Sequence, residues 1–117
     1  MALSGAKSEQ ANLGQFGSIF TDGTGAVVAP SEYIICAITV LDDATFTTLA
    51  VENNASGSRV FANRTNPAHA SDNGSEGSGG ITIASTDVFP TGVTVFGRYT
   101  GFTLAGGSVI AYLAPKH

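Results

Sequence analysis

Short apolar stretches with strand-like alternation recur along the chain, and polar stretches that contain glycine separate them. The clearest is residues 33–41, which is rich in β-branched and aromatic side chains and is apolar at both alternate sets of positions. Such a strand is either central and covered on both faces, or it turns one face towards a neighbouring subunit. No stretch shows the period of an amphipathic helix, so the pattern favours β structure throughout.

Tight turns are expected between these strands. Asp42 and Asp43 are predicted to form a hairpin turn, because Asp side chains accept hydrogen bonds from nearby backbone N–H groups. Glycine-containing turns are predicted at residues 89–92, 100–101 and 105–107. The predicted strands are residues 33–41, 45–51, 59–62, 81–84, 93–99, 102–104 and 108–113. Their number and spacing predict an all-β fold, either an antiparallel β-sandwich or a small, jelly-roll-like barrel.

The chain has 117 residues, which fits one domain. Residues 1–30 are small and glycine-rich, and we expect them to form an extended N-terminal arm or the first strands, with apolar clusters at 16–20 and 26–29. Residues 31–117 are predicted to form a single β domain. Within it, residues 63–80 are the longest polar stretch and are expected to be a loop.

Charge is scarce: charged residues make up 12% of the chain, with five Lys and Arg against nine Asp and Glu. The net charge of −4 argues against a nucleic-acid partner, which would require a basic surface. A free monomer usually has a surface that is about 25–35% charged. Either uncharged polar residues keep this chain soluble, or part of its surface is covered in an assembly, and we expect an assembly.

The chain begins without a basic stretch followed by an apolar one, so we expect no signal peptide. No apolar run approaches the roughly 18 residues of a membrane-spanning helix, so no membrane partner is expected either.

Residues that could carry chemistry are few, and none stands in a catalytic or metal-binding pattern. His69 lies in the polar stretch and His117 is the last residue, so neither is expected to act as a general base. His69, Asp72 and Glu76 do not have the spacing of a calcium-binding loop. Cys36, the single cysteine, lies in the most apolar strand and is expected to be an inert thiol. We predict no enzyme activity, no cofactor and no metal site.

Arg98 is the one charged residue inside an otherwise apolar predicted strand. Its planar guanidinium either pairs with an acid across an interface or extends along the outer face to solvent. The sequence leaves both alternatives open.

Two segments resemble small structural proteins of tailed bacteriophages. Residues 33–53 contain a "LxDxTF" pattern, and residues 88–114 contain "FPxGxxxxGRxxxxxLxxGxxxAY". The matching positions are Leu41, Asp43, Thr45 and Phe46, then Phe89, Pro90, Gly92, Gly97, Arg98, Leu104, Gly107, Ala111 and Tyr112. The two segments cover about 48 of 117 residues, and Tyr99 departs from the Trp expected there.

The resemblance implies a virion structural protein, most like a capsid decoration (cement) protein. It implies a homo-oligomer, expected to be a trimer, that is made in the host cytoplasm and binds the major capsid protein at the capsid surface. The residues expected at the subunit interface are Tyr33, Ile35, Phe89, Pro90, Phe96, Arg98 and Tyr99. The residues expected to contact the capsid through the arm are Leu13, Phe16 and Phe20.

The alternative is a module of a tail or head fibre that recognises host-surface glycan. A glycan reader presents exposed aromatic residues beside polar groups, and this chain has three Tyr and no Trp.

Overall fold

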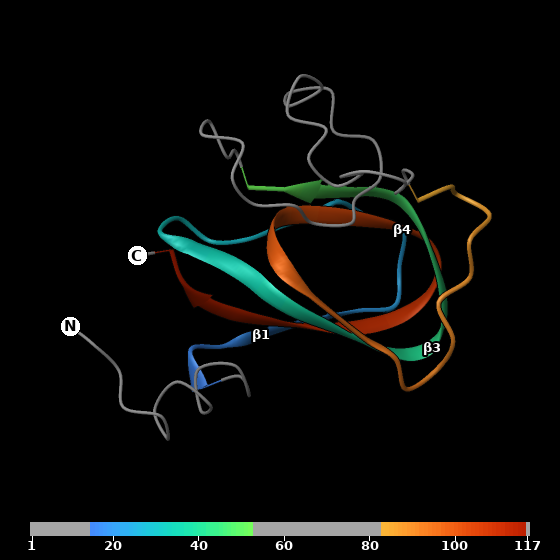
Figure 1. The fold of residues 1–117 in the computed structure, drawn as a ribbon, viewed down its shortest axis with the longest axis horizontal. Coiled ribbons are helices and arrows are strands. Elements are labelled where there is room, and N and C mark those ends of the chain that lie inside the picture. Colours follow the sequence, from blue (N-terminus) through green and yellow to red (C-terminus); the bar gives the residue numbers. More distant parts are fainter. Residues whose placement is uncertain (1–14, 53–82, 117) are drawn as a thin grey trace, which may run out of the picture.

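The computed structural model describes residues 15–52 and 83–116, and its elements within these ranges are all β-strands. They are β1 (Ser18–Thr21), β2 (Val27–Val28), β3 (Tyr33–Val51) and β4 (Thr94–Pro115). The strands form one antiparallel sheet in which β4 pairs with each of the other three (Figure 1). The prediction of an antiparallel β fold is thus confirmed for the described residues.

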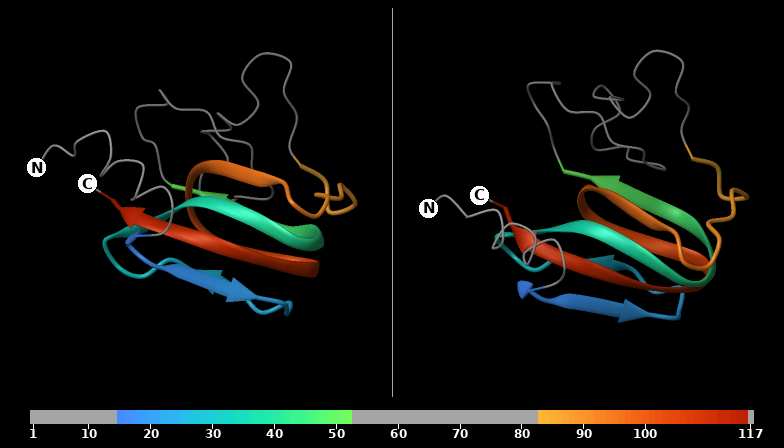
Figure 2. Two further views of the ribbon diagram at one scale, coloured as in Figure 1. Left: turned by 90° about the horizontal axis from the view of Figure 1, so that it is seen from below. Right: turned by 60° about the horizontal axis from the view of Figure 1, so that its bottom comes forward.

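β3 pairs with β4 along two ladders, and the sheet therefore curls back on itself. One ladder runs the length of β3, from Tyr33 to Val51. The other joins residues 35–39 of β3 to residues 94–99 at the beginning of β4. The first part of β3 consequently lies between the two ends of β4, in a central position. In Figure 2 the end of β3 and the beginning of β4 lie on one side of the molecule and β1 on the other.

The prediction of a hairpin turn at Asp42 and Asp43 is wrong. β3 continues through both residues, and its two halves pair with β4 rather than with each other. Register shifts between Val40 and Thr45 bend the strand at this point. Gly107 of β4 lies against the bend with a φ of 89°, and a Cβ at Gly107 would meet the carbonyl oxygen of Asp43. The close approach of the two backbones lets the strands bend together without reversing.

The turns predicted at residues 100–101 and 105–107 are also wrong, because β4 is continuous from Thr94 to Pro115. The glycines in these stretches accompany bends and close strand contacts instead of chain reversals. The turn predicted at residues 89–92 is confirmed: the N–H of Val93 donates to the carbonyl of Pro90 at 3.2 Å, and Gly92 has a φ of 92°. This geometry is that of a type II turn, which favours glycine at its third position.

Two strands form in the glycine-rich N-terminal stretch. β1 pairs with residues 109–112 of β4, and β2 pairs with residues 101–102. The rest of the predicted arm, residues 1–14, lies outside the described residues, as do the predicted strand 59–62 and the predicted loop 63–80. Residues 83–84, the described part of another predicted strand, are not in a strand.

The hydrophobic core lies inside the curl of the sheet, with Phe46 at its centre. The Phe46 ring meets Phe89 edge-to-face at a centroid distance of 5.2 Å and Phe102 at 6.0 Å. Other fully buried members come from both long strands, among them Ile35, Ile38, Leu49, Tyr99, Leu104 and Val109. Since a buried Phe that is cut back to Ala typically costs about 3–5 kcal/mol, these rings dominate the packing.

β3 does not alternate regularly between the core and the outside. Ile35 and Ile38 both belong to the core although they are three residues apart, because the register shifts between them. A shift of one residue reverses which face the side chains occupy. Ala37 and Thr39 therefore lie on the face away from the core.

Candidate functional site

The face of the sheet away from the core carries no charged side chain where β1, β3 and both ends of β4 lie side by side. Directly opposite residues of antiparallel strands point to the same face, so the register defines rows across this surface. One row is Ser18, Tyr112, Ala37 and Phe96, and the next is Phe20, Ile110, Thr39 and Thr94. We call these two rows the outer face.

Two phenylalanines border the outer face. Phe20 in β1 is 59% exposed and Phe96 in β4 is 69% exposed. Between them, the hydroxyl oxygens of Thr39 and Thr94 lie 2.9 Å apart in a hydrogen bond, and Ala37 is buried. These polar groups satisfy each other, so covering the surface costs little in lost hydration. The outer face is therefore suited to contact with another uncharged surface.

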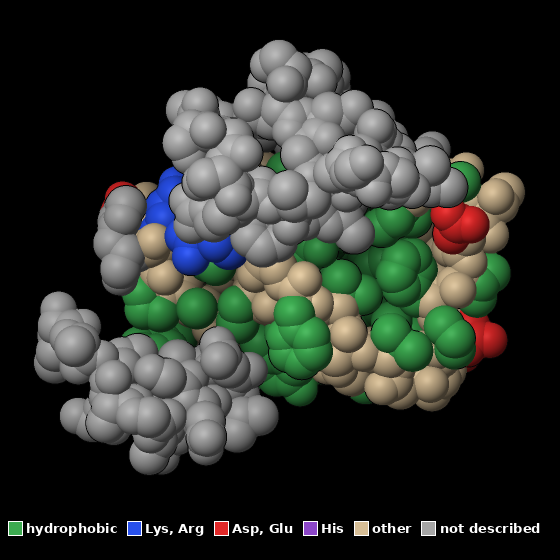
Figure 3. Space-filling model, in the orientation of Figure 1, with side chains coloured by type: hydrophobic (Ala, Val, Ile, Leu, Met, Phe, Trp, Pro, Cys, Tyr) green, Lys and Arg blue, Asp and Glu red, His purple; other side chains and the backbone are tan. Residues whose placement is uncertain are grey.

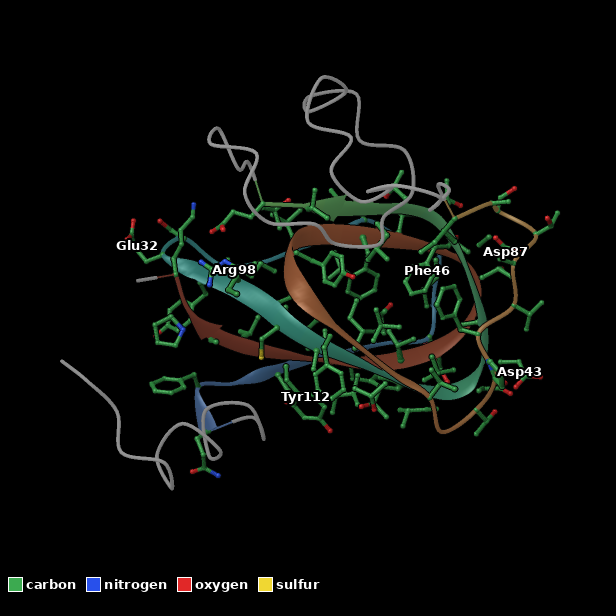
Figure 4. The ribbon with its side chains drawn as sticks, in the orientation of Figure 1. Glu32, Asp43, Phe46, Asp87, Arg98 and Tyr112 are labelled. Carbon is green, nitrogen blue, oxygen red and sulfur yellow. The ribbon has the colours of Figure 1, made fainter. Side chains whose placement is uncertain are left out.

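Charged side chains gather at the two ends of the molecule. In Figure 3, Lys and Arg side chains appear at one end with an acidic side chain beside them, and further Asp and Glu side chains appear at the other end, with hydrophobic and uncharged polar groups between. Figure 4 shows Glu32 and Arg98 at one end, and Asp43 and Asp87 at the opposite end. In the view of Figure 3, the described surface between the two ends carries no charged side chain.

Arg98 pairs within its own chain. Its Nε donates to Oε1 of Glu52 at 2.7 Å, and its Nη2 donates to Oε2 of Glu52 at 3.0 Å and to the carbonyl of Lys116 at 2.9 Å. The hydrogen bond and charge of Glu52 raise the pKa of the Arg98 guanidinium, against a smaller opposing effect of burial. Through these bonds the Arg98 side chain ties β4 to Glu52, which follows β3, and to Lys116, which follows β4.

Asp43 anchors the turn that precedes β4. Its Oδ1 accepts hydrogen bonds from the backbone N–H of Thr91 at 2.8 Å and from the Thr91 hydroxyl at 2.9 Å. These hydrogen bonds, the backbone one first, hold the pKa of the Asp43 carboxyl below its usual value of 3.8. Asp43 was predicted to stabilise a hairpin turn at its own position. It stabilises instead the turn that contains Thr91, 48 residues away along the chain.

An open groove of about 260 Å³ lies beside β2. It is lined by residues 26–28 around β2, by Thr48 and Ala50 of β3, and by residues 100–103 of β4. None of these residues is charged, and most of the surface in the groove is apolar. Val28, which lines the groove, is 71% exposed.

The residues expected at the subunit interface are spread over three environments. Phe96 and Pro90 are exposed, and Tyr33 is 37% exposed. Arg98 and Phe89 are half-buried, with Arg98 in its ion pair and Phe89 against Phe46. Ile35 and Tyr99 have no exposed surface and belong to the core, where burial raises the pKa of Tyr99 to about 12.

The residues expected to contact the capsid are placed only in part. Phe16 is 37% exposed and Phe20, on the outer face, is 59% exposed. Leu13 lies outside the described residues.

Chemically active groups do not gather in the described part of the chain. No group of three or more His, Cys, Asp and Glu there is placed to hold a metal ion. Cys36 is half-buried, and burial raises the pKa of its thiol, which lies 3.5 Å from the carbonyl oxygen of Tyr112. His69, Asp72, Glu76 and His117 lie outside the described residues. Within residues 15–52 and 83–116 there is no helix long and apolar enough to cross a membrane.

Sequence reasoning missed Glu52 and Thr91, the partners of Arg98 and Asp43, and it missed the groove beside β2. An Arg in an apolar strand suggests that an acidic side chain pairs with it. The sequence positions of the nine Asp and Glu residues did not show that this partner is Glu52. The groove has no motif, since it forms only where three separate segments meet.

No protein-family model matches this chain, and no curated protein or solved structure matches it significantly.

Proposed function

We propose that this chain is a structural protein of a bacteriophage virion, and that it acts as a decoration (cement) protein on the outside of the capsid. The observation that carries the proposal is the outer face, an uncharged surface bordered by the exposed rings of Phe20 and Phe96. Large exposed apolar groups on a chain with 12% charged residues are typical of a surface that is covered in an assembly. The sequence resemblance to phage structural proteins supports a virion as this assembly.

The fold proposed for this role is a small β-barrel or β-sandwich. Its support is the pairing of β3 with both ends of β4, which curls the sheet around one core. The residues before β1 would then be an arm that lies on the shell. A rigid core and an apolar surface are sufficient for the proposed task, which needs neither catalysis nor a cofactor.

The proposed mechanism is mechanical. A protein that binds only the assembled shell stabilises that shell by mass action, because every bound copy must be released before the capsomers separate. In the proposed arrangement the partners are further copies of this chain, expected to form a trimer, and the major capsid protein. Nucleic acid and membranes have no part in it.

Counting the copies of this chain in purified particles tests the proposal. Quantitative mass spectrometry against the major capsid protein should give hundreds of copies per particle. A few copies to a few dozen would contradict decoration and would favour the alternative, a tail- or head-fibre module that recognises glycan. Absence from the particle would overturn both functions.

A further inference from the structure

We propose that the groove beside β2 receives Phe96 from the outer face of a second copy of this chain. The inference deepens the proposed function and rests on its self-association, since it states which two surfaces meet. It concerns contacts between copies and leaves contacts with the capsid aside.

The groove beside β2 and the outer face each carry a highly exposed hydrophobic side chain. Among the large hydrophobic side chains of the described residues, Val28 at 71% and Phe96 at 69% are the most exposed. Val28 lines the groove and Phe96 borders the outer face, so one contact covers both side chains. Burying a large apolar side chain that is otherwise exposed favours association, because it removes apolar surface from water.

The groove has the size and chemistry for a phenyl ring. Its volume is about 260 Å³, and an apolar protein cavity of about 150 Å³ is large enough to bind benzene. The residues that line it are aliphatic, aromatic, glycine or threonine. A ring therefore enters without facing a charge.

Charge also favours a second copy as the occupant. The outer face and the groove both lack charged residues, so neither surface must give up the hydration of an ion when they meet. An ionic ligand would find no counter-charge in the groove. A glycan would find few polar groups there, because the threonines are the only lining residues with side-chain hydrogen-bonding groups.

The two surfaces are different patches of one chain. β2 pairs with residues 101–102, whereas Phe96 lies at the beginning of β4, opposite Ala37. A contact between unlike patches can be made twice in a two-fold dimer, or it can link each copy to two different neighbours. We propose the second arrangement, in which the contacts close into a ring, and the trimer of the proposed function is the smallest such ring.

The first experiment is sedimentation of the full chain over a range of concentrations. The wild-type protein should form closed oligomers of three or more copies. Phe96→Ser and Val28→Glu should each weaken association, so that the concentration of monomer at a given total concentration rises at least tenfold. Val88 is 59% exposed and belongs to neither surface, so Val88→Ser and Val88→Glu are the matched controls and should associate like the wild type. Circular dichroism of each variant checks the fold.

Mixing the two variants gives the sharper result. Phe96→Ser retains the groove and Val28→Glu retains Phe96, so a mixture should form one-to-one heterodimers joined by a single intact contact. A face-to-face contact between two outer faces predicts no heterodimer in this mixture. Wild-type protein that stays monomeric, that stops at dimers, or whose variants do not complement would overturn the inference.

Binding of the same proteins to shells that lack this chain separates the inference from the proposed function. Variants that complement each other while the wild type fails to bind shells would keep the contact and overturn decoration. Wild type that coats shells as a monomer would keep decoration and overturn the contact.

Discussion

Single side chains hold the long, bent strands of this protein in place. Asp43 fixes the turn before β4 through Thr91, and Arg98 fixes the ends of β3 and β4 through Glu52 and Lys116. The residues joined by the first contact are 48 positions apart, and Arg98 and Glu52 are 46 apart. These contacts act between distant parts of the chain, so their loss affects the global free energy of unfolding.

Asp43→Asn should lower the free energy of unfolding at neutral pH and have little effect in strong acid. The hydrogen bonds from Thr91 lower the folded-state pKa of Asp43 below its unfolded value of 3.8. The stabilisation is therefore fully present above the unfolded pKa and disappears as the pH falls through the folded one. Urea unfolding at pH 7 and near the acid limit of the fold measures the difference.

Asp42→Asn is the matched control, because it removes the neighbouring exposed carboxylate and leaves the bonds to Thr91 intact. An equal loss of stability from Asp43→Asn at both pH values would contradict the assigned role of the charge.

Glu52→Gln should destabilise the protein by about 1.5–3 kcal/mol, the usual worth of hydrogen bonds to a charged group. Arg98→Lys should also destabilise it, because an ammonium cannot match both carboxylate oxygens. Since both variants break the same pair, their effects should not add, and a double-mutant cycle should show a coupling of about 0.5 kcal/mol or more. Additive losses would mean that the two side chains contribute independently.

At the scale of elements, the positions of the main strand segments were predictable from the sequence, but their connections were not. The β-branched run at residues 33–41 lies in β3, and the predicted strand at residues 93–99 lies in β4 except for Val93. Asp42, Asp43 and Gly107 have the composition of turns, yet they mark a bend at which two strands approach closely. Which strand lies opposite such residues depends on pairing across the fold, and local composition does not contain that information.

Gly107→Ala should destabilise the protein by roughly 1–3 kcal/mol, because the residue has a left-handed φ and a Cβ would press on the backbone of the bend in β3. Thermal unfolding measures the loss. Gly25→Ala is the control: nothing lies within 4 Å of its added Cβ, and the change should be neutral or slightly stabilising. Similar melting temperatures for Gly107→Ala and the wild type would show that the bend does not require glycine.

At the scale of the whole molecule, the scarcity of charge is the feature from which the proposed function follows. The low content of charged residues led us to expect an assembly, and the residues expected to make its contacts included Phe20 and Phe96, which the structure leaves exposed. Ile35 and Tyr99 were also expected at the interface, but they lie in the core. The sequence alone does not distinguish an apolar residue of the core from one of an interface. The groove beside β2 needed the folded arrangement of three segments.

The central claim is that this protein works by covering a shell together with its own copies. Cosedimentation of the purified chain with phage shells assembled without it tests this most directly, with heat release of the packaged genome as a second readout. The account predicts saturable binding at hundreds of copies per shell and a higher temperature of genome release. Shells that remain bare at saturating protein, with an unchanged release temperature, would contradict it.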